Sequence, residues 1–277
     1  MNFQAGLYII STPIGNLSDI TLRALEALQN SDIILCEDTR VTNKLLAKHN
    51  IKASLKLYND NSDRSMRDLI KRLVLEGKVV SLVSDAGTPL ISDPGYKLVR
   101  ELKEDNLHVD VIPGACALIA ALTLSGLATD QFMFLGFLPK TSVGKKKIFE
   151  GLIDIDATLI FYETSSRLIS SLEMALEAFG DREANVSREL TKLYQESRLS
   201  LLSELIEYYK AKPPKGEIVF SISGKGNQEI SEEHIEKEIL TLLSRGMSAR
   251  DVSDAIYSKY KNQFSRNVIY KIANRLK

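Results

Sequence analysis

The chain has 277 residues, with 36 basic and 36 acidic side chains and a formal net charge of zero at pH 7. With 44% hydrophobic and 26% charged residues, the composition is that of a globular protein of about two domains and excludes a largely disordered chain. The zero net charge removes the global signature of a nucleic-acid-binding protein, so such a role would have to come from a local basic patch.

The first part of the chain alternates strand-like and helical patterns. Apolar runs predict strands over 7–11, 33–35, 79–83 and 109–112. Apolar residues at helical spacing predict helices around 22–28 and 66–74. Because the strands are continuously apolar and alternate with helices, we expect a mostly parallel sheet that helices cover on both faces.

A second α/β block runs from about 115 to 224. Apolar runs predict strands over 132–135, 158–162, 185–187 and 218–222, and helical spacing predicts helices near 167–179 and 199–211. The pair Pro213-Pro214 is expected to end the last of these helices. The lysine-rich stretch 139–147 is expected to form an exposed basic loop or helix start.

The C-terminal part contains helical patterns and no predicted strand. Residues 224–227 are interpreted as a linker. Ser248 and Asp251 form an acidic variant of a capping box, and Ser265 can cap a last helix with the apolar face Val268, Ile269, Ile272 and Leu276. The pattern predicts a compact unit similar to a helix-turn-helix. The predicted domains are therefore 1–114, 115–226 and 227–277.

Cysteine and histidine usage gives no sign of a disulfide framework or a metal site. The two cysteines, Cys36 and Cys116, lie inside apolar runs, and no two of the three histidines stand at ligand spacing. No apolar run reaches the roughly 18 residues that span a bilayer, and the N-terminus lacks the pattern of a signal peptide. We expect a cytoplasmic protein that binds no metal and no membrane.

Three loops stand where the predicted strands end, which is where open α/β sheets bind ligands. The first is 11–16, which carries neither the dinucleotide-binding nor the P-loop glycine pattern. The second, SDAGTPLISDPG at 84–95, has two glycines and two prolines that fix an unusual backbone path. In the third, small residues follow Pro113-Gly114 and let a ligand approach the backbone. A polar cluster, Glu37-Asp38-Thr39-Arg40, follows the second strand.

Taken together, these motifs resemble the tetrapyrrole methylase superfamily, and within it the methyltransferases of small-subunit ribosomal RNA. The resemblance covers about 1–224. Its motifs, in chain order, are STPIGNLSDIT, EDTR, SDAGTPLISDPG, VIPGACALIAAL, FYETSSR, SRELTKLYQE and KGEIVF. The sequence departs from the family where Cys116 replaces a frequent serine and where Ser165-Ser166 replaces a proline-histidine pair.

The resemblance implies two α/β domains with S-adenosylmethionine in the cleft between them, plus a small C-terminal helical domain. It also implies a homodimer that methylates the ribose 2′-hydroxyl of a cytidine in the decoding region of 16S ribosomal RNA. The cofactor-binding residues it implies are Ile14, Asp85, Thr88, Ile91, Ser92, Cys116, Ala117, Tyr162, Leu190 and Gly216.

A ribose hydroxyl is a poor nucleophile and benefits from a positioned proton acceptor. The carboxylates considered for this role are Asp38, Glu37, Asp93 and Glu163. We favour the Glu37–Asp38 pair, with Arg40 placed to bind phosphate or to orient a carboxylate.

RNA binding is expected from two basic patches. The segment 259–277 contains six basic residues and no acid, and tyrosines lie between and before them. The expected RNA-binding residues are Lys145, Lys146, Lys147, Lys259, Lys261, Arg266, Lys271 and Arg275. Two alternatives remain open: methylation of a tetrapyrrole precursor, and a non-catalytic RNA-binding module built on a degenerate methylase.

Overall fold

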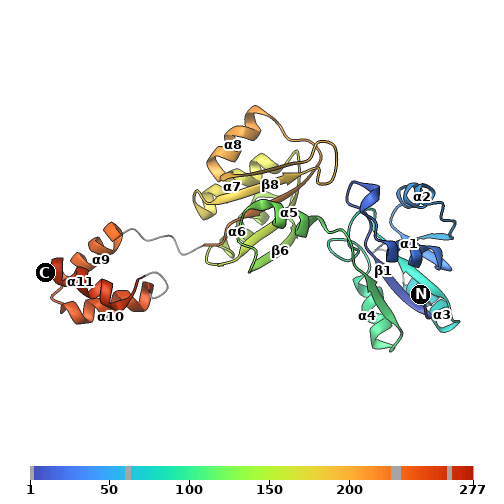
Figure 1. Cartoon of the computed structure of the whole chain (residues 1–277), viewed down its shortest axis with the longest axis horizontal. Coiled ribbons are helices and arrows are strands. Elements are labelled where there is room, and N and C mark those ends of the chain that lie inside the picture. The colour runs from blue at the N-terminus through green and yellow to red at the C-terminus, as the bar shows by residue number, and fades with distance from the viewer. Residues whose placement is uncertain (1–2, 60–63, 226–231, 261–263, 277) are drawn as a thin grey trace. The chain divides into compact units, whose positions relative to one another are not determined.

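The computed structural model describes residues 3–59, 64–225, 232–260 and 264–276 (Figure 1). By its internal contacts the chain divides into two compact units, Met1–Ile153 with Ala157–Gly224 and Asp154–Asp156 with Lys225–Lys277. Two β-sheets lie in the first unit, and the predicted boundary at 114/115 falls between them. The predicted boundary at 226/227, with the end of the expected linker, lies outside the described residues.

The first sheet is parallel throughout, as the apolar strands predicted. Its five strands lie in the order β3-β2-β4-β1-β5. They are β1 (Gly6–Ile10), β2 (Ile33–Cys36), β3 (Leu55–Leu57), β4 (Val79–Leu82) and β5 (Val109–Ile112). The three-residue edge strand β3 was not predicted, because so short a run shows no clear alternation.

Helices cover both faces of this sheet, because successive side chains of each strand point to opposite sides. In β2, Ile34 packs on the face covered by α1 (Leu22–Gln29) and α2 (Thr39–Lys48). Its neighbour Leu35 packs on the opposite face, against α3 (Arg64–Leu75) and α4 (Tyr96–Glu104). The carboxyl ends of β1, β4 and β5 are left uncovered by this arrangement and carry the loops singled out from the sequence.

The second sheet is mixed, in the order β6-β7-β10-β8-β9. Only β6 and β7 are parallel; the other pairs are antiparallel. Its strands are β6 (Phe132–Phe137), β7 (Thr158–Thr164), β8 (Glu183–Arg188), β9 (Glu196–Leu201) and β10 (Glu217–Ile222). The helix predicted from 199 is wrong at its start, because 199–201 belong to β9 and α8 is Leu202–Ala211.

The two faces of the second sheet are packed by different helices. Helix α5 (Ala117–Ser125) covers one face, with Leu118 against Ile160 and Val219. The other face carries α6 (Ser142–Glu150), α7 (Leu168–Phe179) and α8, whose core includes the rings of Phe149 and Phe161 with centroids 5.7 Å apart. The aromatic contacts fix α6 against β7, which matters for the site described below.

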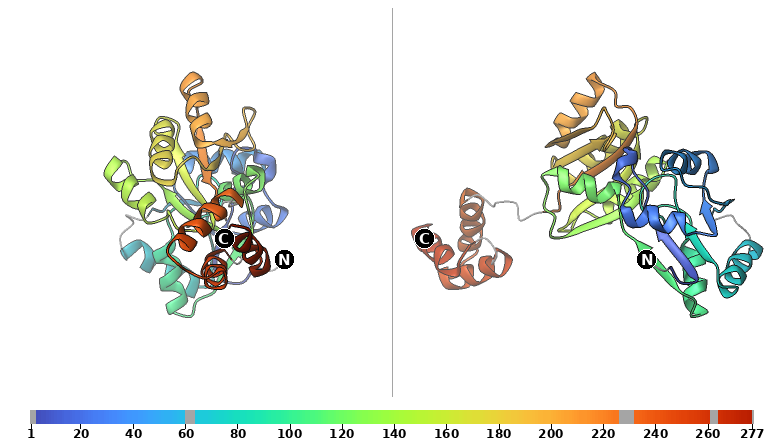
Figure 2. Two further views of the ribbon diagram at one scale, coloured as in Figure 1. Left: turned by 90° about the vertical axis from the view of Figure 1, so that its left-hand side faces the viewer. Right: turned by 45° about the vertical axis from the view of Figure 1, so that its right-hand side comes forward.

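The second unit contains the helices α9 (Glu232–Ser244), α10 (Ala249–Tyr260) and α11 (Arg266–Leu276), which stay grouped in both views of Figure 2. Ile239, Val252 and Ile269 are fully buried among them, as the apolar patterns predicted. Val268 is instead 44% exposed, so its predicted place on the apolar face is wrong. It precedes Ile269 by one residue and therefore points about 100° away from it.

The Ser248 cap of the predicted capping box is present at the start of α10, while the Asp251 carboxylate bonds the Ser248 hydroxyl in place of its backbone N–H. The Asp251 backbone N–H donates to Ser248 Oγ at 3.3 Å, and Ser248 Oγ donates to Asp251 Oδ2 at 2.6 Å. The cap satisfies one of the backbone donors that a helix leaves unpaired in its first turn.

Replacing Ser248 with Ala is expected to destabilise the three-helix unit by about 1 kcal/mol, which speeds amide exchange in α10 about fivefold. Hydrogen exchange on the full chain measures this. The matched control is Ser258→Ala, because this exposed serine lies in the same helix and bonds only the Ala255 carbonyl. Equal exchange rates in Ser248→Ala and the unaltered chain would show that the cap contributes nothing.

Candidate functional site

Loops from both sheets of the first unit enclose a cavity of about 410 Å³. It lies where β1 and β4 end, where α5 begins and where β7 ends and β10 begins. All ten residues that the family resemblance implied for cofactor binding line it: Ile14, Asp85, Thr88, Ile91, Ser92, Cys116, Ala117, Tyr162, Leu190 and Gly216. The sequence motifs therefore converge on one cavity, although they come from positions 14 to 216.

Thr88 joins three of the loops that form the first wall of the cavity. Its hydroxyl lies 3.0 Å from Ser11 Oγ, at the end of β1, and donates to the Ala115 carbonyl, just before α5, at 3.0 Å. One residue earlier, the backbone of Gly87 exchanges two hydrogen bonds with that of Thr12. The shape of this wall is thus fixed by hydrogen bonds between loops far apart in the sequence.

The predicted unusual path of the loop after β4 is present. Leu90 and Ser92 have φ values of 72° and 66°, in the left-handed region that residues other than glycine seldom adopt. Backbone strain of this kind persists only where surrounding contacts impose it, and it is concentrated at functional sites. Here it directs Ile91 and Ser92 into the lining of the cavity.

The opposite wall comes from the second sheet. Tyr162 packs edge-on against Phe134 and Phe137, with ring centroids 4.8 and 5.4 Å apart. Burial raises the pKa of Tyr162 to about 12, and the charge of Asp93 adds to the shift. Asp93 and Tyr162 both line the cavity. Tyr162 stays protonated at neutral pH and offers a neutral, rigid surface to a ligand.

Two glycines allow the close backbone approaches around the cavity. A Cβ on Gly216, which has φ = 88°, would lie 2.1 Å from Glu189 Oε1. A Cβ on Gly15 would lie 2.6 Å from Lys192 Cγ and 2.8 Å from the Leu190 carbonyl. Next to Gly15, the Asn16 backbone N–H donates to Thr191 Oγ1 at 3.0 Å. The loop after β1 thus meets the turn after β8 at contact distance.

The polar cluster after β2 divides into two parts. Glu37 lines the cavity, whereas Asp38 does not. The Asp38 carboxylate caps α2 and accepts hydrogen bonds from the Arg40 guanidinium. These bonds lower the pKa of Asp38 to about 2. Its backbone N–H donates to Asp85 Oδ1 at 3.1 Å. Asp38 therefore contacts the cavity through Asp85 and is a weak proton acceptor.

Asp93 differs from Asp38 in its surroundings. It lines the cavity, and burial raises its pKa above the usual range while a hydrogen bond with Ser84 opposes the shift. Burial also raises the pKa of Asp85. Of the carboxylates considered from the sequence, Asp93 combines a place in the cavity with the pKa shift that suits a proton acceptor.

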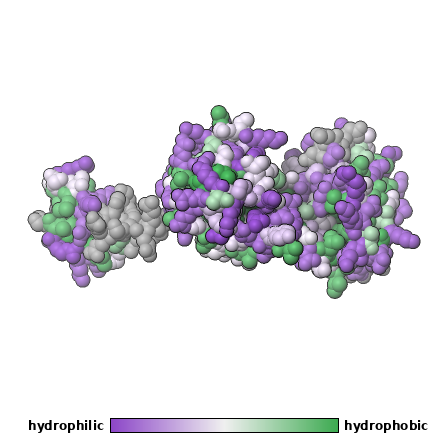
Figure 3. Space-filling model, turned by 90° about the horizontal axis from the view of Figure 1, so that it is seen from above, coloured by the Kyte–Doolittle hydropathy of each residue, from purple (hydrophilic) through white to green (hydrophobic). Residues whose placement is uncertain are grey.

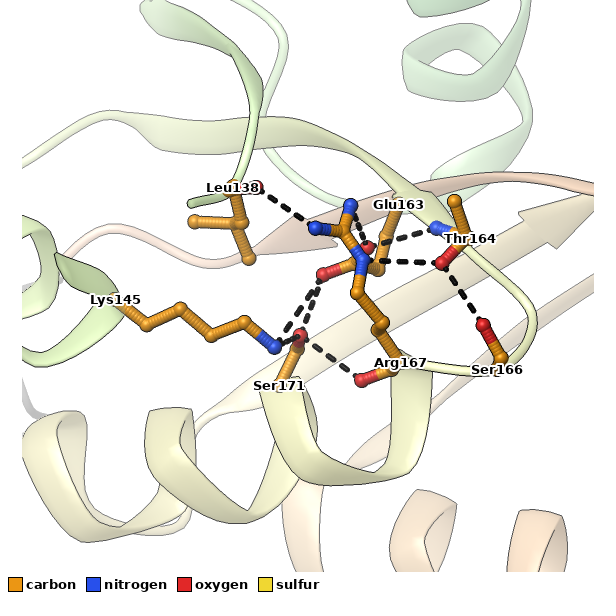
Figure 4. A network of polar contacts seen from close by, with 7 residues as sticks. All are labelled: Leu138, Lys145, Glu163, Thr164, Ser166, Arg167 and Ser171. Atoms are coloured by element: carbon orange, nitrogen blue, oxygen red, sulfur yellow. Dashed lines mark hydrogen bonds and ion pairs between the residues drawn. The ribbon is translucent and has the colours of Figure 1, made fainter. Parts of the chain in front are cut away.

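Glu163, the fourth carboxylate considered, is held by two cations (Figure 4). Its side chain is fully buried; Oε1 lies 2.6 Å from Arg167 Nη2 and Oε2 lies 3.7 Å from Lys145 Nζ. Ser171 Oγ bridges the pair, accepting from Lys145 at 2.8 Å and donating to Glu163 at 2.6 Å. Arg167 also reaches Thr164 Oγ1 and the Leu138 carbonyl.

The expectation that Lys145 binds RNA is wrong. The Lys145 side chain is 3% exposed, because α6 turns it inward to Glu163. Burial lowers the pKa of Lys145, and the Glu163 carboxylate opposes that shift. The sequence showed only a run of lysines, and nothing in the run marks one of them as buried. The network instead anchors the turn that places Thr164 and Ser165 in the lining of the cavity.

None of the other expected RNA-binding residues that the structure describes belongs to the lining of the cavity. Lys146, Lys147 and Lys271 are exposed. Arg266 pairs with Asp254, and Arg275 pairs with Glu236, so acids from other helices partly neutralise the acid-free segment. The Lys259 side chain and Lys261 lie outside the described residues.

The part of the chain that the structure describes shows neither a metal-binding cluster nor a membrane-spanning helix. The described residues contain no group of three or more histidine, cysteine, aspartate or glutamate side chains that could hold a metal ion. None of the described helices has the length and apolar character needed to cross a membrane.

Glu163→Gln is expected to lower the free energy of unfolding by about 3–5 kcal/mol, because it leaves the Lys145 ammonium buried without a carboxylate. Adding Lys145→Met to this variant should restore part of the loss. Urea unfolding of the full chain measures both.

The control for this pair is Glu177→Gln, which removes the exposed partner of Lys146 and should cost less than about 1 kcal/mol. If Glu163→Gln were as mild as Glu177→Gln, the network would have no part in holding the turn.

Comparisons with known proteins agree with this architecture. The family model for tetrapyrrole (corrin/porphyrin) methylases matches residues 6–206. A Rickettsia prowazekii protein named ribosomal RNA small subunit methyltransferase I is 53% identical over 277 residues, covering 100% of this chain and 99% of that protein. A Thermotoga maritima protein of the same name is 44% identical over 79% of this chain and 98% of its own.

Solved structures show the same fold at low sequence identity. The methyltransferase CobJ superposes with a TM-score of 0.59 at 18% identity, over 79% of this chain and 94% of its own. Cobalt precorrin-4 methyltransferase CbiF gives a TM-score of 0.56 at 19% identity, over 78% and 94%. From the family match and the full-length relatives, the chain belongs to the tetrapyrrole (corrin/porphyrin) methylase family.

Proposed function

We propose that this protein is an S-adenosylmethionine-dependent methyltransferase of the ribose 2′-hydroxyl of a cytidine in the decoding region of 16S ribosomal RNA. The observation that carries the proposal is the intact cavity, in a chain that matches a small-subunit ribosomal RNA methyltransferase along its whole length. A degenerate methylase that only bound RNA would have no reason to keep all of these loops.

The lining of the cavity fits S-adenosylmethionine. Its volume of about 410 Å³ falls in the range of cofactor sites. The carboxylate of Asp85 suits the positive charge of a sulfonium, and Ile14 and Leu190 offer apolar surface to an adenine ring. The N-cap residue of α5, Cys116, makes no side-chain cap bond, so the first-turn amides other than that of Leu118, whose backbone bonds Tyr162, can receive the carboxylate of the methionine part.

When bound, S-adenosylmethionine would supply a methyl carbon attached to a sulfonium, which leaves as a neutral thioether. The task of the chain is to hold the ribose oxygen in line behind that carbon, which can supply several kcal/mol of the barrier. A second task is to accept the hydroxyl proton as the oxygen–carbon bond forms. The two walls of the cavity, one from each sheet, would hold the cofactor and the ribose in this alignment. Hydrogen bonds between the loops keep the walls in place.

For the second task we propose Asp93 as the proton acceptor. Its raised pKa brings it closer to the working pH, where a general base acts best. Glu163 is occupied by Arg167 and Lys145, and Asp38 by Arg40. Asp38 and Arg40 then act by orienting Asp85, and Glu37 by accepting the Asp85 backbone N–H at 3.4 Å.

Asp93→Asn is expected to lower kcat by about 100-fold or more while the Kd for S-adenosylmethionine changes little. In the unaltered enzyme kcat/KM, which reports the pKa values of the free enzyme, should fall as the pH drops through the raised pKa of Asp93, because a protonated carboxyl cannot accept the proton.

The comparison variant for this prediction is Asp38→Asn, with methyl transfer and calorimetry as the two readouts. Normal turnover in Asp93→Asn together with lost turnover in Asp38→Asn would return the role to Asp38.

RNA contact is proposed through exposed basic and aromatic side chains. Lys271 is exposed and has no carboxylate partner among the described residues, and Tyr270 on the same helix is 45% exposed. Lys146 and Lys147 form a second patch on α6. Because Arg266 and Arg275 are paired, the salt dependence of RNA binding should be modest.

A homodimer in the cytoplasm is also proposed. Both edge strands of the second sheet expose apolar side chains: Phe132 and Met133 on β6, and Leu199 and Leu201 on β9, each about two-fifths exposed. Such edges are normally covered. On the face shown in Figure 3, hydrophobic areas lie among hydrophilic ones. We propose that a second copy of the chain covers the apolar side chains of these edges. Light scattering would test the dimer.

The function is tested by transferring labelled methyl groups to isolated small ribosomal subunits from a strain that lacks this protein. Label recovered as 2′-O-methylcytidine is expected. No label on subunits together with label on a tetrapyrrole precursor would overturn the proposal in favour of the other chemistry of the family.

A further inference from the structure

A second cavity, of about 470 Å³, adjoins the first in the same unit. It lies between the turn after β8 and the segment that joins α8 to β10. Its lining includes three tyrosines and two lysines at the approach to β10: Tyr194, Tyr208, Tyr209, Lys212 and Lys215. Gly216 lines both cavities, and the neighbours Glu189 and Leu190 line one each. The two cavities therefore share a thin backbone wall.

The acidic groups in the lining are already neutralised. Glu196 pairs with Arg188 at 2.9 Å and accepts the Tyr209 hydroxyl at 3.0 Å. Glu189 pairs with Lys192 at 3.0 Å. An incoming anion would therefore meet no free carboxylate from these two residues.

Tyr194 and Tyr208 are open to solvent to different degrees, whereas Tyr209 is buried with 1% exposure. Tyr194 is 71% exposed, and within the described residues it has no ring or hydrogen-bond partner. Tyr208 is half-buried, and its ring carries the Arg198 guanidinium 3.7 Å from its centroid and Lys212 Nζ at 5.4 Å. Exposed tyrosine rings beside cations are the surfaces on which unpaired nucleic-acid bases stack.

The lysines supply uncompensated charge. Lys212 and Lys215 are exposed, and neither pairs with a carboxylate within the described ranges. By contrast, Lys210, two residues before Lys212 and inside α8, pairs with Glu173 at 2.7 Å. Free positive charge is thus concentrated where the chain leaves α8, beside the tyrosines.

We infer that this cavity binds the RNA nucleotide next to the methylated one, with its base stacked on Tyr194 and Tyr208 and its phosphate on Lys212 and Lys215. The inference rests on the proposed function. Because Gly216 lines both cavities, a nucleotide next to a target ribose in the first cavity would lie at the second one. A flanking nucleotide held in this way would help to keep the target ribose in line.

The sequence provides a direct binding test, because the chain contains no tryptophan. Tyr194→Trp in the full chain introduces its only tryptophan at the proposed stacking position. Titration with a short unmethylated RNA that carries the target cytidine and its neighbours, and that brings no tryptophan of its own as ribosomal proteins would, is expected to quench it. Leu193→Trp is the matched control: Leu193 is adjacent and 88% exposed but does not line the cavity, so its fluorescence should change little.

Kinetics provide the second test. Tyr194→Ala should raise the KM for subunits about 5- to 100-fold, with kcat and the Kd for S-adenosylmethionine little changed. Tyr194→Phe should restore the KM, because stacking needs the ring and not the hydroxyl. Lys212→Ala with Lys215→Ala should raise the KM and flatten its salt dependence, whereas Lys210→Ala should not.

The outcomes separate this inference from the proposed function. Methyl transfer by the unaltered enzyme with no quenching of Tyr194→Trp and an unchanged KM in Tyr194→Ala would overturn the inference alone. Quenching without methyl transfer to subunits would support the RNA site and overturn the proposed activity. Equal quenching at positions 193 and 194 would also overturn the inference, since the contact would not be specific to the cavity.

Discussion

The arrangement of the two sheets around the cavity depends most on the contact between the loop after β1 and the turn after β8. At Gly15 there is no room for a Cβ, because the Lys192 side chain and the Leu190 carbonyl already occupy the space. Ile14, next to it, joins Leu118, Leu190 and Val219 in one apolar cluster. The contact seats the first sheet against the second, and the cavity exists because the loops of both sheets are held around it.

The carboxylates around the cavity differ in how far neighbouring cations compensate their charge. Where a carboxylate supports the structure, cations fix it: Arg40 holds Asp38, and Arg167 with Lys145 holds Glu163. Where a carboxylate faces the cavity with less compensation, as at Asp93, burial raises its pKa. This separation of roles is how neighbouring carboxylates can do different work at one pH.

Much of the site could be predicted from the sequence, because glycines, prolines and small residues fix the loops locally. The path of SDAGTPLISDPG and the small residues around Cys116 were both visible in this way. The burial of Lys145 could not be predicted, because its partner Glu163 is 18 positions away in the sequence and only the packing of α6 on β7 brings the two together. The pairing of Arg266 and Arg275 was missed for the same reason, since the acids lie on other helices. In the fold, the prediction starts a helix at 199 although residues 199–201 end β9, because the pairing of that strand with β8 cannot be seen from the segment itself.

The central claim is that loops of both sheets form one binding site for S-adenosylmethionine. The most direct measurement is calorimetric titration of Gly15→Ala, which pushes the loop after β1 away from Lys192. The matched control is Gly151→Ala, where a Cβ would make only ordinary contacts. We expect binding to be at least about fivefold weaker in Gly15→Ala, as for overpacking at a tight contact, and unchanged in Gly151→Ala. A folded Gly15→Ala variant with an unchanged Kd would contradict the central claim.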